Sequence, residues 1–182
     1  MITEKVWWYV ARSSGLVAWL LLAAAVVWGL LLSTRILQER RRPAWLLDLH
    51  RWLGGLSVVF TGAHLAGLVL DSYVEFGPRE LLVPFASEWR PAAVAWGVVA
   101  LYLLVAVQVT SLFMKRLPRR LWKAIHSSSF ALFWIATMHS AFSGTDVTAN
   151  WYRTGAIVII ATVVFTVLYR VLAGKGRRSL QA

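Results

Sequence analysis

The stretch DLHRWLGGLSVVFTGAHLAG, residues 48–67, places two histidines fourteen residues apart inside a long apolar run. A second stretch, WKAIHSSSFALFWIATMHSAFSGTD at residues 122–146, places two more histidines thirteen residues apart. At about 1.5 Å of rise per residue, each pair spans roughly 20 Å along a helix axis. Two such helices, each with an upper and a lower imidazole, could hold two stacked haems. The four histidines of the chain are His50, His64, His126 and His139.

The composition is that of an integral membrane protein. Hydrophobic residues make up 59% of the 182 residues, and the formal net charge is +11. Nucleic-acid-binding proteins are also basic, but here the charges lie between apolar runs, as in cytoplasmic loops of membrane proteins. We therefore expect a lipid bilayer, and no nucleic acid, as the partner. The absence of cysteine excludes disulfides, iron–sulfur clusters, thiolate ligation and covalently attached haem.

Five segments are long enough to cross a hydrocarbon core of about 30 Å. The sequence therefore predicts an all-α integral membrane protein, a bundle of five transmembrane helices forming one domain over residues 13–172. Residues 1–12 would be an extracytoplasmic N-terminal segment, and residues 173–182 a basic cytoplasmic tail. The predicted spans are 13–33, 46–70, 91–114, 121–142 and 152–172.

The connections between these spans alternate in charge. The first and third are strongly basic, whereas acidic residues concentrate in the second and fourth. The positive-inside rule then places the N-terminus outside and the C-terminus in the cytoplasm, with the bacterial plasma membrane as the expected location. A short interfacial helix is expected at 80–85. The basic residues are Arg35, Arg40, Arg41 and Arg42 in the first connection and Lys115, Arg116, Arg119, Arg120 and Lys123 in the third.

Both histidine-bearing spans are predicted to run outwards from the cytoplasm, so the histidines sort by depth. His50 and His126 would bind the iron of an inner haem, and His64 and His139 that of an outer haem. Two axial imidazoles leave no position for a substrate, which suits electron transfer through b-type haem. For this reason no catalytic residue is assigned.

Cations and glycines near the histidines fit a haem site. Haem propionates need cations near each face, and the candidates are Arg51 and Lys123 inside and Arg153 outside. Snorkelling or topology-setting charges are equally consistent roles for them. Glycines in the segment 46–70 would let a flat macrocycle, or another helix, approach the backbone closely. These glycines are Gly54, Gly55, Gly62 and Gly67.

Ideal helix geometry treats the two histidine pairs differently. At about 100° per residue, a spacing of fourteen returns to within roughly 40° of the starting face, whereas thirteen misses it by roughly 140°. His126 and His139 can serve stacked haems only if the helix tightens into a 3₁₀ turn or their rotamers differ. Two alternatives remain open: ordinary satisfied polar residues, or a proton or metal pathway in a transporter or structural membrane subunit. Asp48 is the main carboxylate for such a pathway.

The two histidine stretches quoted above resemble the ferric reductase-like transmembrane domain, a resemblance that covers about residues 46–172. That family includes ferric reductases, the membrane part of NADPH oxidases and the haem subunit of a bacterial methionine sulfoxide reductase system. Its two-haem members show the same spacings of fourteen and thirteen, unlike cytochrome b of quinol-oxidising complexes. The resemblance implies that His50 and His64 lie on the first ligand helix, and His126 and His139 on the second.

The resemblance implies the membrane subunit of an oxidoreductase that carries electrons across the membrane through two b haems. Six-helix members place the ligands on their third and fifth helices, so this chain is expected to lack one helix at its start. No flavin- or nicotinamide-binding motif follows the last span, so no FAD or NAD(P) is expected in this chain. The donor would be a separate cytoplasmic flavoprotein or a membrane quinol. The external acceptor would be ferric iron, oxygen or a redox protein.

Overall fold

The computed structural model describes residues 2–34, 44–72, 74 and 76–178, and throughout these ranges the chain forms helices and no strand. The all-α prediction is thereby confirmed. The basic residues predicted in the first connection, the acidic Glu75 and the last four residues of the predicted tail lie outside the described residues. The helices are α1 (Ile2–Ser33), α2 (Ala44–Leu70), α3 (Pro78–Leu82), α4 (Pro91–Leu112), α5 (Arg119–Ser127), α6 (Ser129–Ser143) and α7 (Asn150–Arg178).

Four of the described helices are long and apolar enough to cross a membrane. They are found at Lys5–Ser33, Ala44–Leu70, Pro91–Leu112 and Asn150–Leu172. Four of the five predicted spans therefore coincide with single helices, and the predicted segment 1–12 is continuous with the first of them. The remaining predicted span, 121–142, is shared between α5 and α6. A short helix, α3, lies where the interfacial helix is predicted, and it begins two residues earlier and ends three residues earlier than the prediction.

The division between α5 and α6 falls in a run of three serines. The hydroxyl groups of Ser127 and Ser128 donate to the carbonyls of Ala124 and Ile125, at 2.8 and 2.6 Å. Such short-range bonds compete with the helical hydrogen bonds of the backbone. The N–H of Ser128 also bonds to the carbonyl of Ile125, three residues back, at 3.1 Å. This is a tightened turn of the 3₁₀ type, one of the two features that could reconcile a thirteen-residue histidine spacing with stacked haems.

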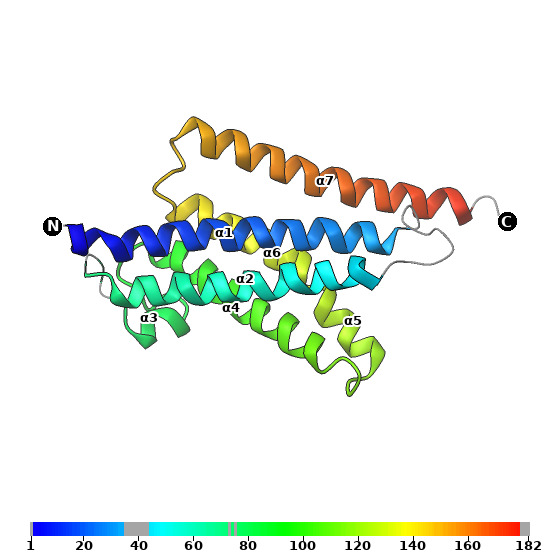
Figure 1. Cartoon of the computed structure of the whole chain (residues 1–182), viewed down its shortest axis with the longest axis horizontal. Helices are drawn as coiled ribbons and strands as arrows, with labels where there is room; N and C mark the ends of the chain where they lie inside the picture. The colour runs from blue at the N-terminus through cyan, green and yellow to red at the C-terminus, as the bar shows by residue number, and fades with distance from the viewer. Residues whose placement is uncertain (1, 35–43, 73, 75, 179–182) are drawn as a thin grey trace.

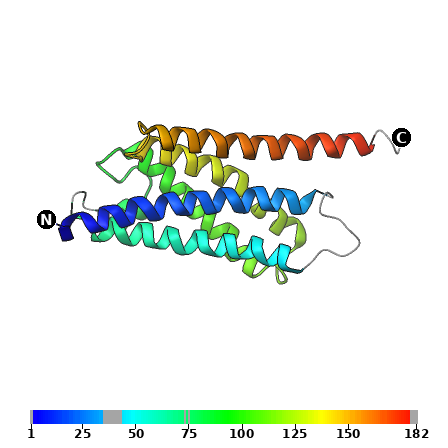
Figure 2. The same ribbon diagram turned by 45° about the horizontal axis from the view of Figure 1, so that its top comes forward.

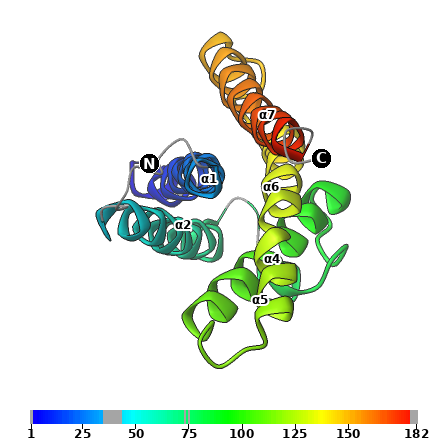
Figure 3. The ribbon, with the colours of Figure 1, turned by 90° about the vertical axis from the view of Figure 1, so that its right-hand side faces the viewer.

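The helices form two groups joined through α1. Helices α1 and α2 run antiparallel and side by side (Figures 1 and 2), and α1 also contacts α6 and α7. Seen end-on, α4, α5 and α6 form the other side of the bundle, and α7 lies outermost (Figure 3). Most of the surface of α2 and α7 is not covered by the rest of the chain. In a bilayer these apolar faces would meet lipid.

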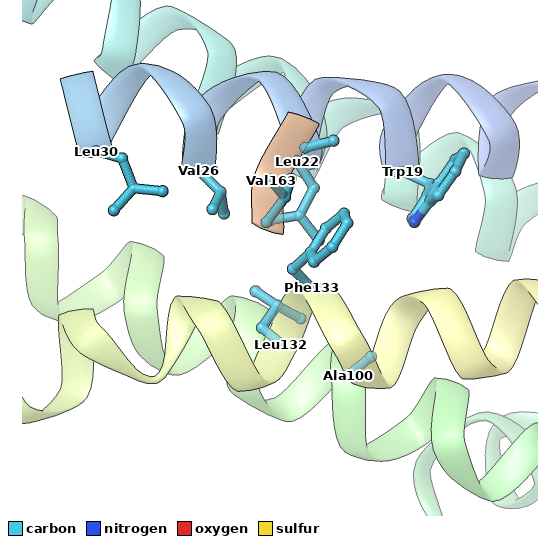
Figure 4. Close-up of a cluster of buried hydrophobic side chains, with 9 residues drawn as sticks. Trp19, Leu22, Val26, Leu30, Ala100, Leu132, Phe133 and Val163 are labelled. Atoms are coloured by element: carbon cyan, nitrogen blue, oxygen red, sulfur yellow. The ribbon is translucent and has the colours of Figure 1, made fainter. Parts of the chain in front are cut away.

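A hydrophobic core joins the two groups at mid-length (Figure 4). Phe133 of α6 is completely buried, and its ring stacks on that of Trp19 of α1 with centroids 6.4 Å apart. The indole N–H of Trp19 donates to the hydroxyl of Thr137 at 2.9 Å. A buried tryptophan therefore has its polar atom satisfied. The other core residues are Leu22, Ala23, Val26, Leu30, Ala100, Leu132 and Val163.

Candidate functional site

The four histidines meet in two facing pairs inside the bundle. The ring centroids of His50 and His126 lie 5.9 Å apart, with the ring planes at 71°. Those of His64 and His139 lie 6.3 Å apart, with the planes at 76°. Helix α2 supplies one member of each pair, and the other members come from α5 and α6. The structure thus brings the histidines together in the two combinations expected from their depth.

The separation within each pair suits two imidazoles that share one metal ion. If each imidazole binds from opposite sides through a metal–nitrogen bond of about 2 Å, the ring centroids lie roughly 6 Å apart. Aromatic side chains in edge contact cover a similar range of distances, so the spacing alone is not specific. The hydrogen bonds to the outward-facing nitrogen atoms add the chemical information.

In the His64–His139 pair, both Nδ1 atoms are held by backbone carbonyl groups. Nδ1 of His64 lies 2.6 Å from the carbonyl oxygen of Ala11 in α1. Nδ1 of His139 lies 2.8 Å from the carbonyl oxygen of Ala93 in α4. A carbonyl only accepts, so each Nδ1 must carry the proton, and Nε2 keeps its lone pair. Histidines that bind metals are commonly oriented in this way, by a hydrogen bond from the second ring nitrogen.

The His50–His126 pair has weaker support. Nδ1 of His126 lies 3.2 Å from the hydroxyl of Ser111, and the ring stacks on Trp122 with centroids 5.1 Å apart. Nδ1 of His50 is buried, and among the described residues it has no hydrogen-bond partner. The two sites therefore differ in how firmly the imidazoles are held.

A cavity of about 300 Å³ opens beside His64 and His139. Its lining is mainly apolar and comes from both groups of helices, with Trp19 and Leu132 on the side of the core. Pockets for small molecules and cofactors begin at about this volume and are typically apolar with a few polar groups. The cavity is therefore suited to a largely apolar ligand.

An ion pair at this cavity was not foreseen from the sequence. Nε of Arg12 donates to Oδ2 of Asp146 at 2.5 Å, and a second guanidinium nitrogen contacts Oδ1 of the same carboxylate. Asp146 is buried, and both residues line the cavity. Arg12 was not among the cations predicted near the histidines. Its place directly before the predicted span 13–33 was the available signal that it enters the bundle.

The three cations predicted near the histidines lie at the surface. Arg51 is exposed and pairs with Asp48 at 3.2 Å, and Lys123 is exposed on α5, one turn before His126. Arg153 is exposed and donates from Nε to the carbonyl of Val147 at 2.9 Å. Arg153 does not line the cavity, whereas Arg12 does.

Of the four glycines singled out in α2, Gly67 has the closest neighbour. A Cβ at Gly67 would lie 2.6 Å from the backbone nitrogen of Ala11, so this glycine permits the close packing of α1 on α2. A Cβ at Gly54 would reach only Gln108 Oε1, at 3.5 Å, and nothing lies within 4 Å at Gly55 or Gly62.

Two facing histidines without further protein ligands favour a metal ion whose other ligands come from a cofactor. Within the described part of the chain, no group of three or more histidine, cysteine, aspartate or glutamate side chains could hold a metal ion. A zinc ion in a structural or catalytic site takes three or four protein ligands. A haem iron already has four porphyrin nitrogens and needs only axial ligands. The two facing imidazoles therefore fit haem better than a bare ion.

The apolar helices indicate an integral membrane protein, and the half-buried, facing histidine pairs are its candidate ligand site. The chain belongs to the family described as ferric reductase like transmembrane component, whose model matches residues 14–138. The match covers more than half of the chain and contains His50, His64 and His126; it ends directly before His139. The family resemblance predicted from the histidine stretches is confirmed, and it identifies a membrane oxidoreductase subunit. No curated protein and no solved structure matches the chain.

Proposed function

We propose that this protein carries electrons across a membrane through two b-type haems held by facing histidines. His50 and His126 would ligate the inner haem, and His64 and His139 the outer haem. In this view the chain is the membrane subunit of a ferric reductase-like oxidoreductase. The observation that carries the proposal is the pair of imidazole–imidazole separations, 5.9 and 6.3 Å, in a chain of this family.

The residues around the histidines would fix and shield the cofactors. A haem ligated in this way changes between ferric and ferrous states and so passes one electron at a time. The carbonyls of Ala11 and Ala93 would orient two of the ligands, and the apolar cavity wall would exclude water from the site. Two axial imidazoles would leave no position for a substrate. The chain would thus conduct electrons rather than bind an acceptor at iron.

Cations near each pair would serve the haem propionates. Arg51 and Lys123 lie towards the His50–His126 end of the bundle, and we assign them to the inner haem. At the other end we retain Arg153 and add Arg12, because Arg12 lines the cavity beside His64 and His139. The guanidinium of Arg12 is shared with Asp146, so a propionate there would compete with that carboxylate.

We propose five membrane crossings, with α5 and α6 together making the fourth. The two helices cover residues 119–143, about 25 residues, and about 20 suffice for a hydrocarbon core. In Figure 1 the connection between α4 and α5 and the end of α7 lie at one end of the bundle, and the connections on either side of α3 and between α6 and α7 lie at the opposite end. Basic charge at the first end assigns it to the cytoplasm of a bacterial cell, with the N-terminus outside.

The electron donor and acceptor would be separate partners. A cytoplasmic flavoprotein, or a quinol in the membrane, would supply electrons to the inner haem. Ferric iron, oxygen or a redox protein would take them from the outer haem. No FAD or NAD(P) site is assigned to the residues described.

The optical spectrum of the purified protein tests this proposal. A pyridine haemochrome assay should report about two non-covalent b haems per chain, each low-spin with two axial imidazoles. A chain that remains folded in detergent and binds no haem when haem is supplied during expression would overturn the proposal. That result would favour the transporter or structural subunit instead.

A further inference from the structure

Each of the four imidazoles rests on a small residue of a neighbouring helix. A Cβ at Gly15 of α1 would lie 2.8 Å from Nδ1 of His64, and one at Gly97 of α4 would lie 2.7 Å from Nδ1 of His139. A Cβ at Gly29 of α1 would lie 3.1 Å from Cε1 of His50. For the fourth imidazole, the contact is the Ser111 hydroxyl at 3.2 Å. A larger side chain at any of these three glycines would occupy space that the rings now fill.

These small residues repeat at the interval of the histidines. Gly15 and Gly29 are fourteen residues apart on α1, which runs antiparallel to α2 with its histidines fourteen apart. Gly97 and Ser111 are likewise fourteen apart on α4. Two helices that carry no histidine therefore present matching recesses at the two depths where the imidazole pairs lie.

The glycines also expose a hydrogen-bond acceptor. Ala11 and Ala93, whose carbonyls hold His64 and His139, lie four residues before Gly15 and Gly97. In an α-helix such a carbonyl accepts the N–H of the residue four positions later, here the glycine itself. Because glycine has no Cβ, the second lone pair of the carbonyl stays accessible to Nδ1–H of the histidine. Ala25 lies four residues before Gly29 in the same way, but no hydrogen bond joins its carbonyl to Nδ1 of His50.

We infer that Gly15, Gly29, Gly97 and Ser111 are positioning residues that seat the four imidazoles for iron ligation. This inference rests on the proposed function, because seating matters only if the rings bind a metal. The ring of an unligated histidine can rotate away from an added methyl group, since it ends a flexible side chain. A ring bound to iron cannot move without losing the metal–nitrogen bond. An added methyl should therefore disturb haem binding more than the fold.

Gly15→Ala and Gly97→Ala test the two tightest contacts. Each should remove the His64–His139 haem or leave it with one axial ligand, so that about one low-spin haem per chain remains. Gly155→Ala is the matched control, because it adds the same methyl to helix α7 where nothing lies within 4 Å. That control should keep both haems. Haem stoichiometry and the low-spin ferric signals in electron paramagnetic resonance are the readouts, with His64→Ala as the reference for loss of this haem.

Gly29→Ala and Ser111 variants test the other pair. At 3.1 Å the methyl of Gly29→Ala requires only a small movement, so we expect a changed ferric signal for the His50–His126 haem without its loss. Ser111→Ala removes the acceptor for Nδ1 of His126, which lowers the basicity of the ligand and should raise the midpoint potential of that haem. Ser111→Thr keeps the hydroxyl and should restore the original potential.

The outcomes separate this inference from the proposed function. A wild-type protein without haem would end the proposed function. A wild-type protein with both haems, in which Gly15→Ala behaves like Gly155→Ala, would overturn only the positioning role. Equal loss of both haems from Gly15→Ala would also overturn it, because the inferred effect is confined to one depth. A midpoint potential unchanged in Ser111→Ala would remove Ser111 from the set.

Discussion

Gly67 of α2 lies directly against the backbone of Ala11 of α1. A Cβ at Gly67 would fall 2.6 Å from the nitrogen and 2.9 Å from Cα of Ala11. The carbonyl of the same alanine accepts the hydrogen bond from His64, three residues before Gly67. The tight contact between α1 and α2 and the hydrogen bond that orients His64 therefore involve the same turn of α1, at Ala11, and the same turn of α2.

Gly67→Ala should destabilise the protein. The methyl would meet backbone rather than a flexible side chain, so α1 and α2 must separate, and overpacking of this kind costs about 1–3 kcal/mol. Gly55→Ala adds the same methyl where nothing lies within 4 Å, and it should be neutral or stabilising by up to about 1 kcal/mol. Thermal unfolding followed by circular dichroism in detergent compares the two. Equal melting temperatures would contradict the packing role of Gly67.

Single histidine variants should remove the haems separately. His64→Ala or His139→Ala should lose the haem at one depth or leave it high-spin, while the haem of His50 and His126 stays low-spin. The reason is distance, since the two histidines of α2 lie about four helical turns apart. Optical and paramagnetic resonance spectra of the four variants check this. Equal loss of both haems in folded protein from every variant would contradict the assignment by depth.

The connection that follows α2 and the connection between α4 and α5 should lie on opposite sides of the membrane. The chain contains no cysteine, so Ser72→Cys and Arg116→Cys each introduce a single thiol. The positive-inside rule predicts that an impermeant thiol reagent labels intact cells at position 72 and not at position 116. Labelling after the cells are opened controls for accessibility. The reverse pattern would exchange the inner and outer haem assignments.

Asp146→Asn should lower stability through the loss of its pairing with Arg12. The carboxylate is buried and accepts two guanidinium contacts, and leaving a partly buried charge without its partner costs on the order of 2 kcal/mol. Asp48→Asn is the control, because its pairing with Arg51 is exposed and should contribute less than about 1 kcal/mol. Melting temperatures of the two variants measure the difference. A larger effect from Asp48→Asn would contradict the structural importance of the buried pair.

The features that the sequence predicted depend on one segment at a time. Apolar length and charge alternation are local, and they predicted the four single-helix spans and which histidines face each other. The recesses at Gly15, Gly29 and Gly97 depend on which helices become neighbours, which no local pattern specifies. Arg12 was not predicted at the site for a related reason: its partner Asp146 lies 134 residues along the chain, and only tertiary packing brings the two together.

The turn at Ser128 changes the angle between the directions of His126 and His139. A continuous helix would rotate His139 away from the direction of His126, whereas the tightened turn allows each half to keep its own phase. The half with His126 carries the basic residues of α5, and the half with His139 packs against α4. Removing the hydroxyl groups of Ser127 and Ser128 would favour one continuous helix. That helix would point His126 and His139 in different directions. The three serines therefore allow two helices with different histidine orientations to follow each other within one predicted span.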